Sequence, residues 1–421
     1  MEDNRLRLPW LTVAITRPEV ARSQKALRSE AGAITRMLRQ GVVDSVHIRK
    51  PEATAEQIAA LLDLIPERLH PCLCLHDHFE LVERYPLLDG VHLNGRNPVF
   101  DDEAYTLSAS CHTVEEARER QDLDYVTLSP VFDSLSKKGY RGRFAGADLR
   151  SDLKDTCQVV GMGGVLPGDF CELQRQGFRG AAMLGYVWQR PQYRTFGAIR
   201  KANRIRETFA LQFITDGATV EETERQVKGA VRGGCRWVQI RMKDAPEGEV
   251  MRALGKVAPL CREKGVTLLV DDHVPLAADW CDGVHVGKND MPAPQARERL
   301  TLGSIIGSTA NSPEDVERVW QAGGSDYIGL GPLRFTTTKK NLAEPLGLEG
   351  IRSIMEGMRH RRMSLPVVAI GGITPEDVRP LLEAGVHGVA VCGAIAHAPD
   401  PEAATKAFIT EIEKYYNLND K

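Results

Sequence analysis

The sequence lacks the long hydrophobic runs of an exported or membrane-bound protein. It contains no stretch of about 18 consecutive apolar residues, which is roughly the length that a membrane-spanning helix needs. The first ten residues, MEDNRLRLPW, also lack the apolar core of a signal peptide. We therefore expect a cytoplasmic protein that does not bind a membrane.

The chain has little net charge and no basic excess. Lys and Arg together number 54 against 57 Asp and Glu, which gives a formal net charge of −3. A nucleic-acid-binding domain usually carries a basic surface and a high isoelectric point. We therefore expect small-molecule partners and no nucleic acid, and we leave a homo-oligomer open.

Cysteine is scattered and odd in number. Nine cysteines without regular spacing fit a reduced compartment better than a disulfide framework. The closest pair, Cys72 and Cys74, alternates within an apolar run, which is typical of a buried strand rather than a metal site.

Short apolar runs alternate with segments of helical spacing along the whole chain, as in βα units around a parallel sheet. A chain of 421 residues is long enough for two domains. In the second half eight such runs occur within about 210 residues, which favours a closed (β/α)8 barrel, with a doubly wound open sheet as the alternative. The runs begin at Leu211, Trp237, Thr267, Gly283, Ile305, Tyr327, Val367 and Gly388.

The first half repeats this pattern in the same order. DGVHLNGRN, from Asp89, corresponds to DGVHVGKND, from Asp282, and the other runs follow suit. An internal duplication explains this order, and we predict two tandem (β/α)8 TIM barrels, over residues 1–200 and 205–421. The eight runs of the first half begin at Leu11, Ser45, Cys72, Gly90, Thr106, Asp124, Gln158 and Gly180.

Polar residues at the carboxyl ends of the strands are the candidates for function, because the active site of such a barrel lies there. The run VQIRMK places Gln239, Arg241 and Lys243 at alternate positions, so a continued strand would send them to one side. The alternative is that these charges are simply solvated.

Acidic residues end the next strand and follow the one after it. Asp271 and Asp272 come from the third run, and Asp290 follows the fourth. Carboxylates at neighbouring strand ends could bind Mg²⁺, which prefers oxygen ligands together with substrate phosphate and water. Alternatively, Asp272 caps a helix and Asp290 begins a turn.

The remaining strand ends suit phosphate groups. Glycine loops after the last two strands of such a barrel usually bind phosphate through backbone N–H groups. Together with the nearby cations, this predicts a ligand with more than one phosphate group. The contributing residues are Thr309, Thr336, Thr337, Thr338, Lys339, Gly371, Gly372, Cys392 and Gly393.

The motifs VQIRMKD, LLVDDHVPLAAD, DGVHVGKND, YIGLGPLRFTTTKK, VVAIGGI and GVAVCGAI, in this order, resemble thiamine-phosphate synthase over residues 205–420. The resemblance implies that a hydroxymethylpyrimidine diphosphate is joined to a thiazole phosphate, in its carboxylated or decarboxylated form, with release of pyrophosphate. It also implies departure of pyrophosphate before the thiazole nitrogen attacks. Such a step needs charge neutralisation rather than a nucleophile.

The resemblance assigns a role to each candidate residue. It implies that Asp272 and Asp290 bind Mg²⁺ and that Arg241, Lys243 and Lys339 are catalytic. Gln239, Arg241 and Lys243 would bind the pyrimidine diphosphate, with Asp271 beside them, and Thr309 and Lys339 would contact the pyrophosphate. The thiazole phosphate would be held by Thr336, Thr337, Thr338, Gly371, Gly372, Cys392 and Gly393.

Three positions depart from the family pattern. Asp271 stands where Asn is common, which adds negative charge beside the metal and could disturb pyrimidine recognition. Gly393 and Thr309 each replace a usual serine, so Gly393 keeps only the backbone donor.

The first half has lost part of this set. His47, Pro51 and Asn97 stand in place of Gln239, Lys243 and Asp290, although Arg49 and Asp77 remain. This loss argues against a diphosphate–magnesium site.

Instead, HIR, SCHT and SPVFDSLSKKGY resemble the thiazole tautomerase branch of the same superfamily, over residues 10–190. This resemblance implies that His112 is an acid/base catalyst, a role for which imidazole is suited near neutral pH. Lys137, Lys138, Gly163 and Gly164 keep a phosphate-binding character. The chain would then be bifunctional.

Several alternatives stay open. The first half could be a degenerate barrel kept for stability or dimerisation, or a weak second synthase. The whole chain could be a ligand-binding sensor of the thiamine pathway, although both Asp272 and Asp290 are retained. A different phosphate-handling barrel, for example an isomerase or aldolase of another family, would need a base or a Schiff-base lysine inside the barrel, and the strand ends show none in the expected interior register.

Overall fold

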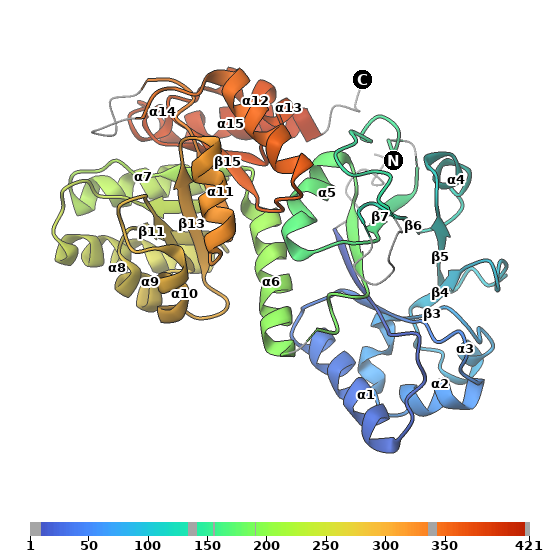
Figure 1. The fold of residues 1–421 in the computed structure, drawn as a ribbon. Helices are drawn as coiled ribbons and strands as arrows, with labels where there is room; N and C mark the ends of the chain where they lie inside the picture. Colours follow the sequence, from blue (N-terminus) through green and yellow to red (C-terminus); the bar gives the residue numbers. More distant parts are fainter. Residues whose placement is uncertain (1–9, 134–140, 155, 190, 336–342, 417–421) are drawn as a thin grey trace. The chain divides into compact units, whose positions relative to one another are not determined.

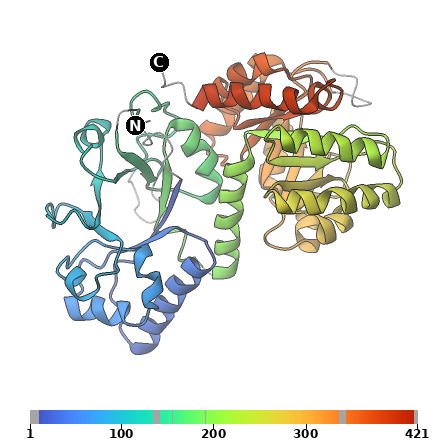
Figure 2. The same cartoon turned by 180° about the vertical axis from the view of Figure 1, so that it is seen from behind.

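The computed structural model describes residues 10–133, 141–154, 156–189, 191–335 and 343–416. The chain forms two compact units, Met1–Arg200 and Lys201–Lys421. Each unit contains a closed barrel of parallel strands, β1 to β8 in the first and β9 to β16 in the second. The prediction of two tandem (β/α)8 barrels is therefore confirmed, and in each barrel the helices lie outside the strands (Figure 1 and Figure 2).

The first barrel contains the eight strands that the sequence predicts. Each strand pairs in parallel with the next strand along the chain, and β8 pairs with β1. The strands are β1 (Leu11–Ile15), β2 (Ser45–Ile48), β3 (Leu73–Leu75), β4 (Gly90–Leu93), β5 (Thr106–Cys111), β6 (Tyr125–Leu128), β7 (Gln158–Met162) and β8 (Gly180–Met183). The helices are α1 (Gln24–Arg39), α2 (Ala55–Leu62), α3 (Leu81–Arg84), α4 (Val114–Glu119), α5 (Phe170–Gln176) and α6 (Gln192–Thr208), with 3-10 turns at Glu67–Cys72 and Pro167–Asp169.

The second barrel also follows the predicted runs. Its strands are β9 (Leu211–Ile214), β10 (Trp237–Ile240), β11 (Thr267–Asp271), β12 (Gly283–Val286), β13 (Ile305–Ala310), β14 (Tyr327–Leu330), β15 (Val367–Ile370) and β16 (Gly388–Val391). Its helices are α7 (Val220–Arg232), α8 (Glu247–Glu263), α9 (Val274–Trp280), α10 (Ala293–Arg299), α11 (Pro313–Ala322), α12 (Gly347–His360), α13 (Pro375–Glu383), α14 (Gly393–Ala396) and α15 (Pro401–Tyr416).

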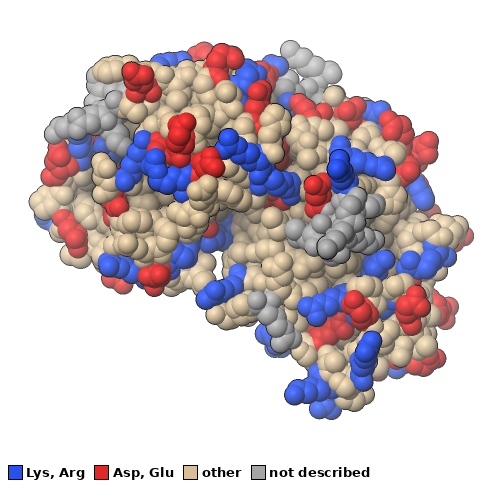
Figure 3. Space-filling view, in the orientation of Figure 1, with Lys and Arg blue, Asp and Glu red and all other residues tan. Residues whose placement is uncertain are grey.

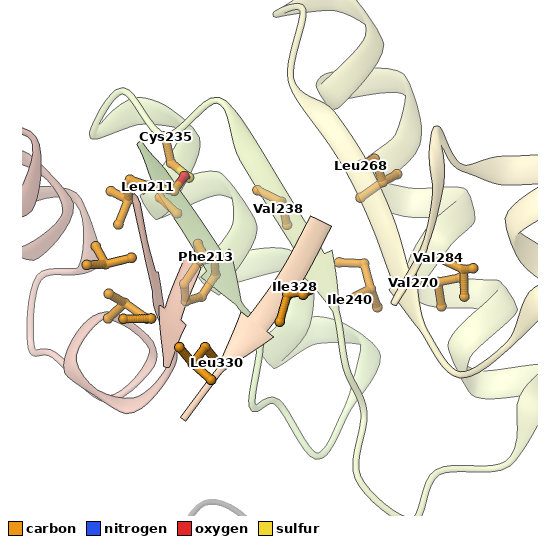
Figure 4. Close-up of a cluster of buried hydrophobic side chains, with 14 of the residues drawn as sticks. Leu211, Phe213, Cys235, Val238, Ile240, Leu268, Val270, Val284, Ile328 and Leu330 are labelled. Atoms are coloured by element: carbon orange, nitrogen blue, oxygen red, sulfur yellow. The ribbon is translucent and has the colours of Figure 1, made fainter. Parts of the chain in front are cut away.

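The strands of the second barrel are buried on both faces, which is why they read as continuous apolar runs. Side chains on the outward face pack against the helices in one large cluster that includes Phe213, Val238 and Ile328 (Figure 4). Inside the barrel, the ring centroid of Trp237 lies 4.9 Å from that of Phe209 and 4.8 Å from that of Tyr327. These aromatic rings fill the interior near the amino ends of the strands, because Trp237 and Tyr327 are the first residues of β10 and β14.

The helical layer of the first barrel is thinner than that of the second. Among the described residues, β4 and β5 have no helix between them, whereas α10 occupies the equivalent place in the second barrel. The helix after β3 has 4 residues, against 7 in the equivalent α9. The two copies therefore share strands and strand order, while the outer layer has diverged.

The surface agrees with the near-neutral composition. Acidic and basic side chains are mixed over the face seen in Figure 3. Among the described residues, no helix is long and apolar enough to cross a membrane.

Candidate active site at the mouth of the second barrel

A cavity of about 800 Å³ opens at the carboxyl ends of the strands of the second barrel. Its lining brings together most of the predicted site residues, although they lie up to about 150 positions apart in the sequence. The lining includes Gln239, Arg241, Asp271, Asp272, Asp290, Thr309, Gly371, Gly372, Cys392 and Gly393.

One wall of the cavity is a hydrogen-bonded group built on β10 and β11. The amide nitrogen of Gln239 donates to Oδ1 of Asp271 at 2.6 Å. The Nε atom of Arg241 lies 3.3 Å from Oδ2 of the same carboxylate, and its Nη1 lies 3.6 Å from Oδ1 of Asp216. Asp271 thus orients both the amide and the guanidinium group.

The carbonyl oxygen of Gln239 is left over by this arrangement. It is buried and has no hydrogen-bond partner among the described residues. A buried acceptor without a partner is unfavourable. It is therefore suited to accept a hydrogen bond from a ligand.

Asp272 and Asp290 face each other at the rim. Asp272 directly follows β11 with a positive φ of 62°, and its amide donates to the carbonyl oxygen of His285 at 2.9 Å. Asp290 is held by the amide of Gly287, which donates to its Oδ2 at 2.9 Å. Partial burial, the charge of Asp271 and a hydrogen bond to Asp290 raise the pKa of Asp272 to about 8.

Repulsion between Asp272 and its acidic neighbours Asp271 and Asp290 contributes to this raised pKa, after burial. Asp272 and Asp290 are both solvent-exposed oxygen donors on neighbouring strand ends. A hard divalent cation would remove the repulsion, and Mg²⁺ takes one or two carboxylates and completes its shell with water and phosphate. The residues present therefore fit Mg²⁺.

A chain of hydrogen bonds crosses the base of the cavity. Tyr327 bonds Nδ1 of His285 through its hydroxyl at 2.9 Å, and Nε2 of His285 lies 3.0 Å from the Thr309 hydroxyl. The amide of Gln212 also donates to the Tyr327 hydroxyl at 3.0 Å. This chain fixes the orientation of Thr309, which the sequence placed in the site.

The glycine loops approach the cavity as predicted from the sequence. Gly371 and Gly372 have positive φ angles of 104° and 67°. A Cβ atom on Gly371 would lie 2.5 Å from Cβ of Pro332. Only glycine fits this turn, and its backbone can therefore come close to a ligand. Cys392 and Gly393 line the cavity at the start of α14, and burial raises the pKa of the Cys392 thiol to about 12.

Lys243 differs from its prediction. Strand β10 ends at Ile240, so Lys243 lies in the following turn and the alternation of a strand no longer fixes its direction. It is not among the described residues that line the cavity. Thr336, Thr337, Thr338 and Lys339 lie outside the described residues.

Sequence reasoning missed several residues of this site. Asp216 contacts both Arg241 and His397, whose Nε2 lies 3.2 Å from Oδ2 of Asp216. Lys288 also lines the cavity and forms an ion pair with Asp315. Two of them carried a usable signal, because Asp216 ends the first strand run and Lys288 lies in the motif DGVHVGKND, whereas His397 lies outside the quoted motifs.

The mouth of the first barrel is built differently. Asp77, the counterpart of Asp272, accepts hydrogen bonds from Nε and Nη2 of Arg96 at 3.1 and 2.8 Å. Asn97, at the position of Asp290, lies 3.4 Å from the same carboxylate. The first barrel therefore carries a positive side chain, Arg96, at the place where the second barrel carries the acids Asp272 and Asp290.

His112 lies at the end of β5 and is exposed. Its Nδ1 is 3.2 Å from the carbonyl oxygen of Ser129. Because a carbonyl only accepts, this contact favours the tautomer with the proton on Nδ1, while the Ser129 hydroxyl lies 3.4 Å from the same nitrogen. Gly163 and Gly164 keep the positive φ angles of their counterparts, 94° and 65°, while Lys137 and Lys138 lie outside the described residues.

Both halves of the chain match the same family model. The model for thiamine monophosphate synthase matches residues 14–187 and again residues 211–395. The chain belongs to the thiamine monophosphate synthase family. It is accordingly an enzyme of that family, and the duplication predicted from the sequence is a duplication of the family's domain.

Thiamine-phosphate synthases from several bacteria are similar in sequence to about half of this chain. A thiamine-phosphate synthase of Bacteroides thetaiotaomicron is 50% identical over 201 residues, which are 48% of this chain and 96% of that protein. A thiamine-phosphate synthase of Flavobacterium johnsoniae is 40% identical over 191 residues, 45% of this chain and 90% of that protein. A solved structure of thiamine phosphate pyrophosphorylase from Pyrococcus furiosus is 34% identical, with a TM-score of 0.44, and covers 50% of this chain and 98% of its own.

Proposed function

We propose that the second barrel joins a hydroxymethylpyrimidine diphosphate to a thiazole phosphate, giving thiamine phosphate and pyrophosphate. The observation that carries this proposal is the convergence of an acidic pair, Asp272 and Asp290, with Arg241 in one cavity. Release of pyrophosphate needs positive charge beside the leaving group, which Arg241 and a divalent cation bound by the two acids would supply.

The described residues divide the substrates between them. The unpartnered carbonyl of Gln239 accepts a hydrogen bond from the amino group of the pyrimidine. Arg241, held by Asp271 and Asp216, donates to the diphosphate. The backbone of Gly371 and Gly372 binds the phosphate of the thiazole and places its ring nitrogen opposite the pyrimidine.

Mg²⁺ would be held by Asp272 and Asp290, and it would neutralise charge on the departing pyrophosphate. Arg241 contributes to the same neutralisation from the side of β10. Lys243 and Lys339 remain predicted contributors. Thr309, oriented by His285, donates a hydrogen bond from its hydroxyl group to a phosphate oxygen.

For the first barrel we infer an isomerase rather than a second synthase, with the tautomerase reaction on the thiazole carboxylate phosphate as the candidate. The supporting observation is the exposed position of His112 at the end of β5, with its Nδ1 3.2 Å from the Ser129 carbonyl oxygen. The alternative, a degenerate barrel without activity, predicts that His112 can be replaced freely.

Pyrophosphate release by the full-length chain, assayed with both substrates and Mg²⁺, tests the synthase assignment. We expect Asp290→Ala to lose at least about 100-fold in rate, because one of two metal ligands is gone. The matched control is Asn97→Ala in the first barrel, which should keep the full rate. An Asp290→Ala variant with the rate of the unaltered chain would contradict the proposal.

The first barrel needs a different assay, because its product is the substrate of the second. With the aromatic thiazole phosphate, His112→Ala should release pyrophosphate at the normal rate. With the non-aromatic tautomer, under conditions of slow spontaneous isomerisation, the same variant should fall to the uncatalysed rate. Equal activity with that tautomer would contradict the tautomerase assignment and favour the degenerate barrel.

A further inference from the structure

Three histidines meet inside the first barrel, at a level where the second barrel carries part of its active site. His47 lies on β2, His76 directly follows β3 and His92 lies on β4. One ring nitrogen from each lies within 4.8 Å of the others, and among the described residues this is the one such group of three or more potential metal ligands.

The rings contact one another directly. Nδ1 of His47 is 2.8 Å from Nε2 of His76. The rings of His76 and His92 are stacked, with centroids 4.2 Å apart and an angle of 21° between their planes. All three side chains are buried. The cluster is therefore a compact set of nitrogen donors shielded from bulk water.

Imidazole binds metal ions in its neutral form, which the burial of all three rings favours. Burial, followed by the neighbouring imidazoles, lowers the pKa of His47 and His76 well below the ordinary value. Burial alone lowers the pKa of His92 to about 3.

Hydroxyl groups hold one ring nitrogen of His47 and both ring nitrogens of His92. The Tyr125 hydroxyl lies 2.5 Å from Nε2 of His47, which leaves Nδ1 facing His76. His92 bonds the Ser108 hydroxyl through Nδ1 at 2.8 Å and the Ser110 hydroxyl through Nε2 at 2.9 Å. Metal-binding histidines usually have such a partner on the second nitrogen, which fixes the ring and its tautomer.

The second barrel does not repeat the cluster. Its corresponding residues are Gln239, Asp271 and His285, of which the first two form the wall that holds Arg241. The first barrel has therefore replaced an amide and a carboxylate by two further imidazoles. Three neutral imidazoles suit a borderline transition-metal ion such as Zn²⁺, whereas the oxygen set of the second barrel suits Mg²⁺.

We propose that the first barrel binds one Zn²⁺-class divalent ion through His47, His76 and His92. Tetrahedral Zn–N bonds of about 2.0–2.1 Å would place these nitrogens about 3.3 Å apart. His47 and His76 separate slightly to reach this spacing. His92 turns one nitrogen out of the stack and keeps a serine on the other. Three protein ligands leave a fourth position for water.

Zinc binding to the full-length chain tests the proposal independently of the synthase activity. Metal-free protein is titrated with ZnCl2 by calorimetry in saturating Mg²⁺, in the Asp290→Ala background, so that the second barrel does not contribute. We expect one equivalent to bind. Uptake of less than about one-tenth of an equivalent would overturn the proposal.

Substitution locates the ion. His76→Gln should weaken binding at least about tenfold. The matched control is His78→Gln, two residues away, whose side chain instead bonds Ala53 and Glu80; it should bind zinc normally. Equal binding by the two variants would overturn the proposal.

X-ray absorption at the zinc edge on the protein with unaltered histidines decides the matter if His76→Gln fails to fold. Three imidazole ligands are expected, and a mainly oxygen shell would contradict the assignment. Pyrophosphate release should be unchanged in His76→Gln, so a negative zinc result leaves the function of the second barrel standing.

Discussion

The two barrels have the same strands in the same order, yet their mouths handle charge in opposite ways. In the second barrel Asp272 and Asp290 lie together, and the pKa of Asp272 is raised to about 8. In the first barrel Asp77 is bound by Arg96, and Asn97 has replaced the second acid. The second barrel, where we expect a cation and a diphosphate, keeps two neighbouring acids. The first barrel, where we expect neither, neutralises its remaining acid with its own Arg96.

The two barrels also differ at the strand ends below the rim. The second barrel uses Gln239 and Asp271 to aim Arg241 into the cavity. In the first, the corresponding residues are His47 and His76, which bond to each other. Duplication therefore preserved the scaffold, while a few substitutions at strand ends changed the kind of ligand that each mouth suits.

The largest difference between the barrels is expected from the shared arginine. Arg241→Met should lower kcat/KM for pyrophosphate release by about 100- to 1,000-fold, the usual effect of losing one donor to a developing negative charge. Arg49→Met, at the equivalent position of the first barrel, should stay within about twofold when the aromatic thiazole phosphate is supplied. Steady-state kinetics gives kcat/KM for both variants. Similar losses in the two would contradict the expected difference between the barrels.

Acid should destabilise the first barrel before the second. The pKa values of His47, His76 and His92 are lowered by burial first, so the folded barrel binds fewer protons than the unfolded chain below about pH 6.5. Stability that is complete above this pH is lost as pH falls, by about 1.4 kcal/mol per pH unit for each histidine that stays neutral.

Hydrogen exchange of the metal-free protein at pH 7 and pH 5, corrected for intrinsic rates, measures this loss. Peptides covering β2 to β4 should lose protection, and peptides covering β10 to β12 should keep it. Equal behaviour of the two sets would show that the buried histidines do not distinguish the barrels.

A smaller difference is expected at the amino ends of the strands. Asp282 is paired with Arg204 at 2.7 Å, whereas its counterpart Asp89 has a hydrogen bond from Thr106 and, among the described residues, no cationic partner. Burial raises the pKa of Asp89, so its negative charge disfavours the folded state at neutral pH, and this penalty disappears below about pH 4.

Asp89→Asn should therefore raise the melting temperature at pH 7 and change little at pH 3.5. Asp282→Asn should lower stability by about 1 kcal/mol or less, because the lost ion pair is partly exposed. Thermal unfolding of the two variants provides the test. An Asp282→Asn variant more stable than the unaltered chain would contradict this prediction.

The fold could be predicted almost completely from the sequence, because strands buried on both faces appear as apolar runs and the duplication lets each half check the other. The strand ends predicted Gln239, Arg241, Asp272 and Asp290 for the same reason. Lys243 lies beyond the last strand residue, where alternation gives no direction.

What the sequence did not predict depends on contacts across the barrel. His47, His76 and His92 lie on three strands, and only closure of the barrel brings their rings together. The pairing of Arg96 with Asp77, 19 residues away, was likewise not predicted. Such pairings become visible only when strand register and loop path are both known.

The central claim is that the mouth of the second barrel, and not that of the first, binds Mg²⁺ with the diphosphate. The most direct test is a crystal structure of the full-length chain with Mg²⁺ and an unreactive analogue of the pyrimidine diphosphate. We predict metal density between Asp272 and Asp290 with the diphosphate against Arg241, and Arg96 still bound to Asp77. Metal at Asp77, or a diphosphate remote from Arg241, would contradict this account.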